Sequence, residues 1–137
     1  MRYWLFKSEP DVFGWADLVA KGAQGEEWDG VRNYQARNNM RAMKIGDRGL
    51  FYHSNIGKEA VGIAEVIAEA HPDSTTEDDR WECVDIKAVE KLPNPVSLAA
   101  VKEEPRLKDM VLAGNSRLSV QPVTEEEWAV IMELAGR

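Results

Sequence analysis

The segment WDGVRNYQARNNMRAM, residues 28–43, gathers side chains that could recognise a base in a nucleic acid. The rings of Trp28 and Tyr34 could stack on a base, and the amide of Asn33 could hydrogen-bond to its edge. A solvated helix face paired with acids elsewhere explains the nearby positive charge equally well. In this window only Asp47 opposes five basic residues that could track a phosphate backbone: Arg32, Arg37, Arg41, Lys44 and Arg48.

Two shorter clusters offer further hydrogen-bonding groups. FYHSN, residues 51–55, ends a predicted strand and delivers His53, Ser54 and Asn55 to a loop, a common place for recognition groups. The alternative for these residues is an ordinary hairpin turn. In SRLSVQ, residues 116–121, Arg117 and Ser119 would point the same way from a strand. Together the clusters suit one edge of a planar base.

Trp28 differs from the other tryptophans in its surroundings. It lies between GEE and DGVRN, outside any periodic segment, which favours a functional role. We therefore expect Trp28→Ala to abolish selective binding of a base while leaving the fold intact. The remaining tryptophans lie in apolar or amphipathic patterns and are predicted to be structural: Trp4, Trp15, Trp81 and Trp128.

Catalytic motifs do not stand out in the chain. It contains no Gly-x-Ser-x-Gly sequence, and Gly57-Lys58 lacks the other residues of a phosphate-binding loop. Cys83 and His53 could form a nucleophile–base pair, but a buried thiol is the favoured interpretation of Cys83. We predict no metal, no cofactor and no enzymatic activity. A nucleoside-processing enzyme with His53 as acid–base group and a small-molecule sensor remain the alternatives.

The whole composition indicates one globular domain. The chain has 137 residues, of which 44% are hydrophobic, enough to bury a core without disulfides or metals. The single cysteine and the polar N-terminal residues favour a soluble cytoplasmic protein. No apolar run is long enough to span a membrane, and the protein is expected to be a monomer. The net charge of −7 argues against tight non-specific adhesion to nucleic acid or anionic lipid.

The periodicity predicts the elements that must position these side chains. Strands are expected over residues 2–8, 49–53, 60–69 and 81–89, with a short one within 115–123 and with the prolines of LPNPV ending the fourth. Helices are expected over about 11–21 with Asp11 as N-cap, over 34–43 capped by Asn33, over 97–103, and after Thr124. The residues between 21 and 27 read as a loop. This order predicts an α+β fold around a small mixed or barrel-like sheet.

Five segments resemble, in order, those of the EVE domain family: YWLFKSEP, WDGVRNYQARNNM, GDRGLFYHSN, VGIAEV and SRLSVQPVTEEEW. The resemblance covers nearly the whole chain and implies a single EVE domain over residues 1–137. Members of this family have a PUA-like fold, are similar to the YTH readers of methylated adenosine in RNA, and are associated with modified cytosines in DNA. Some bacterial members are linked to defence or base-modification systems, and a bacterial origin is expected here.

The resemblance also implies roles for individual residues. Trp28 matches one wall of the aromatic cage of YTH domains, and Tyr34, Phe51 or His53 are alternatives for the second wall. The edge of the base would be read by polar side chains, among them Lys7, Ser8, Asn33, His53, Ser54, Asn55 and Ser119. The flanking phosphates would be held by Arg32, Arg37, Arg41 and Arg117. The expected partner is therefore modified DNA or RNA, and the expected function is non-catalytic reading of a modified nucleobase.

Overall fold

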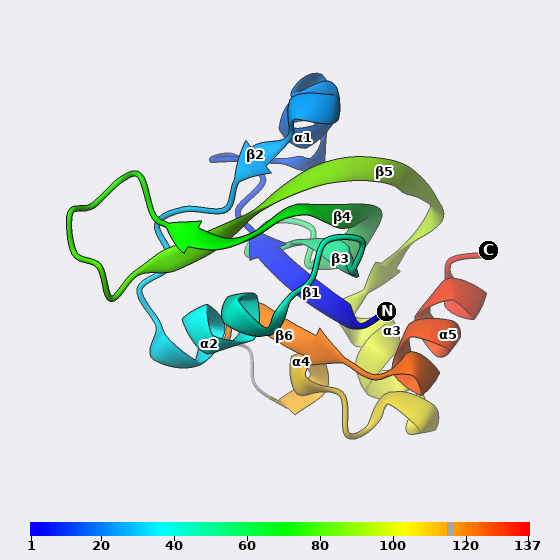
Figure 1. Ribbon diagram of the computed structural model, residues 1–137. Coiled ribbons are helices and arrows are strands. Elements are labelled where there is room, and N and C mark those ends of the chain that lie inside the picture. Colours follow the sequence, from blue (N-terminus) through cyan, green and yellow to red (C-terminus); the bar gives the residue numbers. More distant parts are fainter. Residues whose placement is uncertain (115–116) are drawn as a thin grey trace.

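The computed structural model of the chain describes residues 1–114 and 117–137, and a curved mixed sheet runs through this part (Figure 1). Its strand order is β2-β5-β4-β3-β1-β6. The neighbours β1 and β3 are parallel, whereas the other neighbouring pairs are antiparallel. The strands are β1 (Tyr3–Ser8), β2 (Glu26–Glu27), β3 (Arg48–His53), β4 (Glu59–Pro72), β5 (Glu82–Ser97) and β6 (Val120–Val123).

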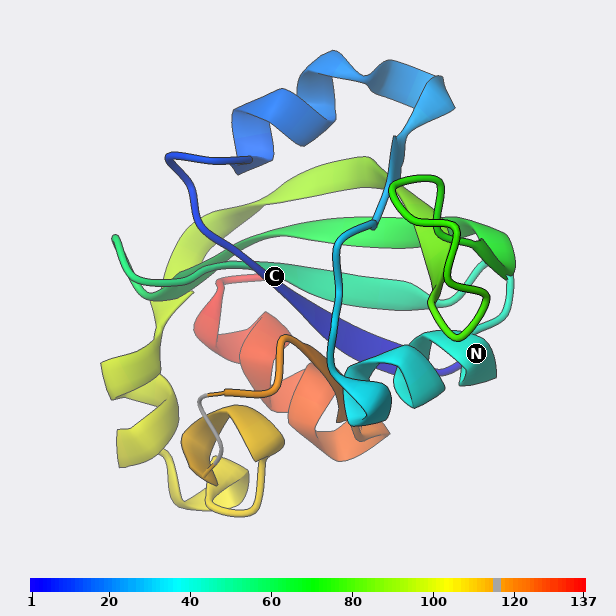
Figure 2. The same ribbon diagram turned by 90° about the vertical axis from the view of Figure 1, so that its left-hand side faces the viewer.

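Helices cover both faces of this sheet (Figure 2). The helical elements are α1 (Trp15–Ala20), η1 (Gly22–Gln24), α2 (Tyr34–Ala42), α3 (Leu98–Glu103), η2 (Pro105–Leu107), α4 (Val111–Gly114) and α5 (Glu125–Leu134). Trp4 and Phe6 of β1 pack with residues of α1 and α2, while Leu5 packs with residues of α3, α4 and α5. Successive side chains of a strand alternate between faces, so the all-apolar β1 is buried on both sides, as its sequence predicts.

Local sequence signals fix α2 and α5. The side chain of Asn33 accepts a hydrogen bond from the Ala36 N–H at 2.9 Å and so caps α2, as predicted. Thr124 and Glu127 form the predicted capping box of α5, in which each side chain satisfies the other's backbone N–H. Met40 of α2 is buried, so the methionine side of this helix faces the core, as predicted.

Two predicted boundaries are wrong. The first helix begins at Trp15 with Gly14 as N-cap, not at Asp11. Residues 10–13 form a turn instead, in which the backbone N–H groups of Val12 and Phe13 both bond to the carbonyl of Glu9. The carboxylate of Asp17 then caps the helix by accepting from the Gly14 N–H at 2.7 Å, a local bond that Asp11 cannot make from its position.

The other wrong boundary concerns LPNPV, which does not end a strand. β5 continues through Pro93 and Pro95 to Ser97. Both prolines fall within a register shift between β4 and β5, and the only other neighbour, β2, pairs far away at Ile86 and Asp85. A proline removes a donor from the sheet, which is tolerated at an irregularity with a free edge. Residues 21–27, predicted as a loop, hold η1 and the short strand β2.

The predicted fold class is confirmed: an α+β arrangement in which a mixed sheet is flanked by helices. None of the helices in the described residues has the length and apolar character needed to cross a bilayer. The long loop between β4 and β5 extends away from the body of the sheet, in green in Figure 1. This loop and the segment after β2 together form one side of the candidate site.

Candidate functional site

A pocket of about 500 Å³ opens where the end of β1 meets the segment that follows β2. This volume lies within the range of roughly 300–1,000 Å³ that is typical of small-molecule sites. Apolar side chains, carboxylates and cationic groups share its lining. The lining residues are Lys7, Ser8, Glu9, Val12, Phe13, Glu26, Glu27, Trp28, Asp29, Gly30, Val31, Arg32 and Ser119.

Trp28 supplies the largest ring of the pocket lining. Its backbone N–H donates to the Val84 carbonyl on β5 at 2.8 Å, which anchors the residue to the sheet. Its side chain meets three phenylalanine rings edge to face, at centroid distances of 5.6, 6.1 and 5.7 Å: Phe6, Phe13 and Phe51. Trp28 is only 8% exposed and belongs to the core cluster beneath α1 and α2. It is therefore at once a core residue and a wall of the pocket.

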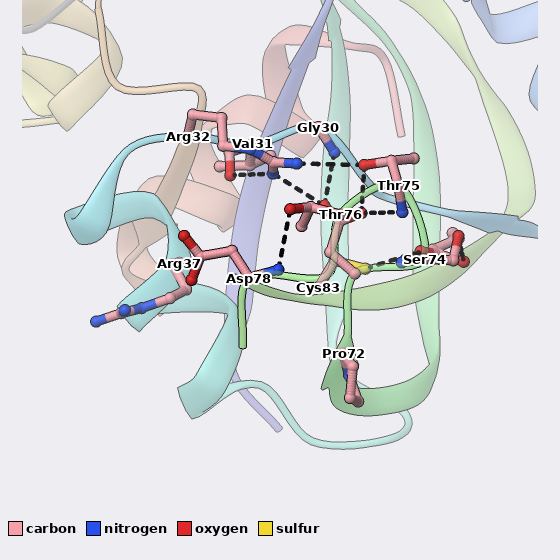
Figure 3. A network of polar contacts seen from close by, with 12 residues as sticks. Gly30, Val31, Arg32, Arg37, Pro72, Ser74, Thr75, Thr76, Asp78 and Cys83 are labelled. Atoms are coloured by element: carbon pink, nitrogen blue, oxygen red, sulfur yellow. Dashed lines mark hydrogen bonds and ion pairs between the residues drawn. The ribbon is translucent and has the colours of Figure 1, made fainter. Parts of the chain in front are cut away.

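Asp73, in the β4–β5 loop, holds the segment that follows Trp28. Its buried carboxylate accepts hydrogen bonds from the Gly30 N–H at 2.9 Å, from the Arg32 guanidinium at 3.0 Å and from the Thr75 N–H at 2.8 Å. Burial opposes the charge, but these bonds outweigh it and lower the pKa of Asp73 to about 2. Figure 3 shows Gly30, Arg32 and Thr75 converging across this gap. The carboxylate thus ties one wall of the pocket to the long loop.

The opposite side of the pocket is the end of β1. The Lys7 N–H donates to the Ser119 carbonyl at 2.9 Å, and the Ser54 N–H donates to the Ser8 carbonyl at 2.9 Å. The Ser8 hydroxyl donates to the Phe13 carbonyl and so draws the turn before α1 towards the strand. Burial lowers the pKa of the Lys7 ammonium. Three predicted site residues, Lys7, Ser8 and Ser119, are thereby placed together in the lining.

Beside the pocket, aromatic and guanidinium groups form a continuous stack. The rings of Tyr34 and Trp81 lie 4.9 Å apart at an interplanar angle of 24°. Arg37 lies over the Tyr34 ring at 4.8 Å, and Arg32 lies over the Trp81 ring at 5.4 Å. Tyr34 is 50% exposed and Trp81 is half-buried, so Trp81 is not the core residue that its sequence pattern predicts. Arg32 joins this stack to the pocket, because it belongs to both.

The arginines predicted to hold phosphates differ in how far their charges are already paired. Arg32 pairs with Asp73 at 3.0 Å, and Arg41 pairs with Glu82 at 2.5 Å. Arg37 instead donates to the Arg80 carbonyl and to the side chain of Asn38, which are neutral. Within residues 1–114 and 117–137, no carboxylate forms an ion pair with Arg37. Arg117 is exposed in the turn that precedes β6.

The other predicted base-binding residues lie outside the pocket lining. Asn33 caps α2 through its side-chain oxygen. His53 accepts a hydrogen bond from the Trp15 N–H at 3.1 Å, and burial, opposed by the charge of Glu59, lowers its pKa. The Asn55 amide donates to the Glu9 carboxylate at 2.7 Å, and Ser54 precedes it in the same turn. In these contacts the side chains of Asn33, His53 and Asn55 hold the helix ends and loops around the site.

Residues far apart in the sequence bring a possible set of metal ligands together behind the pocket. The ligand atoms of Glu27, His71 and Cys83 lie within 4.8 Å of one another, a cluster that their spacing in the sequence does not reveal. Each is already hydrogen-bonded: the Cys83 thiol to Glu27, Glu27 to Ser74, and His71 to Asp85. Burial raises the pKa of the Cys83 thiol, and it is fully buried, as predicted. These hydrogen bonds account for the cluster without a metal.

The pocket lining also contains residues that the sequence reasoning missed. The apolar ones are Val12, Phe13 and Val31, and the acidic ones are Glu9, Glu26, Glu27 and Asp29. A signal was present for Asp29, since it directly follows Trp28 in the irregular segment already singled out. No periodicity pointed to the turn that carries Phe13, because residues 10–13 were expected to be helical.

Comparison with known proteins connects this architecture to a family. The family model named EVE domain matches residues 2–134. The chain belongs to the EVE domain family. It is 37% identical over 164 residues to the human protein named thymocyte nuclear protein 1, covering 96% of this chain and 73% of that protein.

Solved structures of the family superpose closely on this EVE domain chain. A crystal structure of an Agrobacterium tumefaciens protein is 60% identical with a TM-score of 0.97, covering 99% of this chain and 94% of the other. Human THYN1 protein, crystallised in complex with 5-methylcytosine containing DNA, is 36% identical with a TM-score of 0.91, covering 100% and 99%. The YTH domain of Zygosaccharomyces rouxii MRB1 is 17% identical with a TM-score of 0.59, covering 98% and 86%, and thus shares the fold.

Proposed function

We propose that this protein is a non-catalytic reader that binds nucleic acid carrying a modified base and holds that base in the pocket lined by Trp28. The observation that carries the proposal is the pocket itself: about 500 Å³ of space with an anchored indole in its lining and arginines beside it. Modified cytosine in DNA is the proposed ligand. Full-length similarity to human THYN1 protein, seen in complex with 5-methylcytosine containing DNA, supports this choice.

Energetics favour such a site. A base must leave its stack to enter a pocket, which costs a few kcal/mol. Stacking on an aromatic side chain returns roughly 1–3 kcal/mol per base, and the hydrogen bonds at the base edge add to this. Trp28 is held by the Val84 carbonyl and by its neighbouring rings, so little ordering is needed when a base arrives.

The proposed roles follow from position. Trp28 stacks on or walls the base, and Lys7, Ser8 and Ser119 face its polar edge. Arg37, whose charge has no carboxylate partner in the described part of the chain, holds a flanking phosphate. Arg32 extends the pocket towards the Tyr34–Trp81 stack, where a neighbouring nucleotide would rest. The other predicted contacts, from Asn33, Arg41, His53, Ser54, Asn55 and Arg117, border this surface.

A binding titration tests the proposal. Labelled oligonucleotides that differ at one base (cytosine, 5-methylcytosine, 5-hydroxymethylcytosine, adenine or N6-methyladenine) are titrated as single and double strands, in DNA and in RNA. Trp28→Phe, which retains an aromatic core residue but shortens the stacking ring, is compared with the same change at Trp128. Trp128 stacks on Tyr3 in the core cluster on the other face of the sheet.

We expect tighter binding to one modified base than to its unmodified parent, by about tenfold, because one methyl group in an apolar pocket is worth about 1–3 kcal/mol. Trp28→Phe should reduce this preference, while Trp128→Phe should leave it unchanged. Equal weak binding to every oligonucleotide, or turnover of any of them, would overturn the proposal.

A further inference from the structure

Asp29 stands out among the four carboxylates in the pocket lining. The Glu9 carboxylate accepts from Asn55, the Glu27 carboxylate accepts from Ser74, and Glu26 lies 3.9 Å from the Lys21 ammonium. The carboxylate of Asp29 has no hydrogen-bond or ion-pair partner within residues 1–114 and 117–137. It is therefore the acidic group of the lining that is available to a ligand.

The backbone on both sides of Asp29 is fixed. The Trp28 N–H bonds to the Val84 carbonyl at 2.8 Å, and the Gly30 N–H bonds to the buried Asp73 carboxylate at 2.9 Å. Asp29 is thus held immediately beside the largest ring of the pocket by the sheet on one side and by the long loop on the other. A ligand that packs against Trp28 meets a carboxylate whose attachment point does not move.

The surroundings of Asp29 favour a hydrogen-bond donor. Burial raises the pKa of this carboxyl, and the negative charges of Asp73, Glu27 and Glu26 raise it further, against the opposing effect of Arg32. A carboxylate under this repulsion gains from any group that brings an N–H to it. It would be opposed by a ligand that presents only an acceptor.

The chemistry of methylated pyrimidines makes this preference decisive. 5-Methylcytosine and thymine share the ring and the methyl group, so an apolar wall cannot distinguish them. They differ at position 4, where cytosine has an amino donor and thymine has a carbonyl acceptor. A carboxylate accepts from the cytosine amine, as Asp and Glu side chains do at base edges, and repels the thymine carbonyl.

We propose that Asp29 is the specificity-determining residue that reads the 4-amino group of a pyrimidine in the pocket and excludes thymine and uracil. This inference rests on the proposed function of the pocket. It assigns the distinction between 5-methylcytosine and thymine to one carboxylate, whereas the distinction between 5-methylcytosine and cytosine belongs to the apolar lining.

The test uses the full chain and DNA duplexes with one central base, cytosine, 5-methylcytosine or thymine, opposite an abasic site. The abasic partner removes base-pairing strength from the comparison. Asp29→Asn keeps the size of the side chain but offers either an oxygen or an NH₂ group, so it satisfies both pyrimidines. Asp79→Asn, in the exposed part of the β4–β5 loop and outside the pocket lining, makes the same change of charge elsewhere.

For the unchanged protein we expect binding to 5-methylcytosine to exceed binding to thymine by at least tenfold, since one good polar base contact is worth about 1–3 kcal/mol of discrimination. Asp29→Asn should reduce this ratio to below threefold, mainly by raising the affinity for thymine. Asp79→Asn should leave the ratio unchanged.

Two results would overturn the inference alone: an unchanged ratio in Asp29→Asn, or an equal loss of affinity for both bases. Either would be seen while the unchanged protein still prefers 5-methylcytosine over cytosine, so the proposed function would stand. Absence of that preference in the unchanged protein overturns both the function and the inference.

Discussion

Trp28 is held by contacts that serve the core and by contacts that shape the pocket. Its backbone bond to Val84 and its three phenylalanine neighbours would exist in any well-packed domain. Its position in the lining is what makes it available to a ligand. A substitution that removes the ring therefore acts on both, and the expectation that Trp28→Ala leaves the fold intact does not survive its burial.

We predict that Trp28→Ala lowers the free energy of unfolding by about 3–5 kcal/mol, the usual cost of removing a buried aromatic side chain. Urea unfolding followed by circular dichroism measures this directly. Tyr34→Ala serves as a control, because that ring is half exposed and should cost much less. A loss below about 1 kcal/mol for Trp28→Ala would mean that the indole is not packed as described.

Arg37 and Arg41 lie on the same helix but differ in their partners. Arg41 faces the Glu82 carboxylate, whereas Arg37 contacts only neutral groups in the described residues. We predict that Arg37→Gln reduces the slope of log K against log salt by about 1, the amount expected for one lost phosphate contact. Arg41→Gln should change the slope less. Binding measured at four salt concentrations decides, and equal slopes for both variants would remove Arg37 from the interface.

At the scale of elements, the predictions that succeed depend on local bonds. Asn33 caps α2 and Thr124 begins α5 because each bond joins residues three positions apart. The start of α1 and the length of β5 depend on distant partners. His53 meets the backbone N–H of Trp15, and the prolines of β5 fit only because β2 ends before reaching them. No window of sequence contains those contacts.

The candidate site divides in the same way. Lys7, Ser8 and Trp28 belong to odd local segments and were identified from sequence, and the structure brings them together in one lining. Asp73 was not, because its partners Gly30 and Arg32 lie more than forty residues away. A buried aspartate in a polar loop looks like any solvated one until the fold is known.

The β4–β5 loop provides a test of that buried carboxylate. The pKa of Asp73 is lowered to about 2, so the unfolded chain binds a proton more readily than the folded one. The stabilisation is complete above about pH 4 and is lost as the pH falls from about 4 to 2, by an amount on the order of 2 kcal/mol. We predict that Asp73→Asn removes this part of the acid dependence. Unfolding free energies measured from pH 7 to pH 2 test it.

Asp78 in the same loop is the matched control. Its bonds to Arg80 also lower its pKa to about 2, but the two side chains are 32% and 62% exposed. Exposed ion pairs contribute little to stability because solvent screens them. Asp78→Asn should therefore leave the acid dependence nearly unchanged. Equal effects of the two variants would show that burial does not set the contribution of these carboxylates.

For the whole molecule, the sign of the charge is the main constraint on how it meets DNA. The net charge of −7 opposes long-range attraction to phosphates, and carboxylates line much of the pocket. Two of the predicted phosphate-binding arginines, Arg32 and Arg41, already face acidic partners. Affinity must then come from contacts made at one base rather than from the backbone along its length.

This distribution predicts a shallow salt dependence. We expect log K for the modified duplex to fall with log salt at a slope between about −1 and −3, corresponding to one to three phosphate contacts. Unmodified DNA should bind weakly at every salt concentration, because nothing compensates for the repulsion of an acidic surface. Titrations between 50 and 300 mM salt, roughly the range over which counterion release is measurable, provide both slopes. A slope steeper than about −5 would instead require a broad basic surface, which is incompatible with a pocket that recognises its ligand one base at a time.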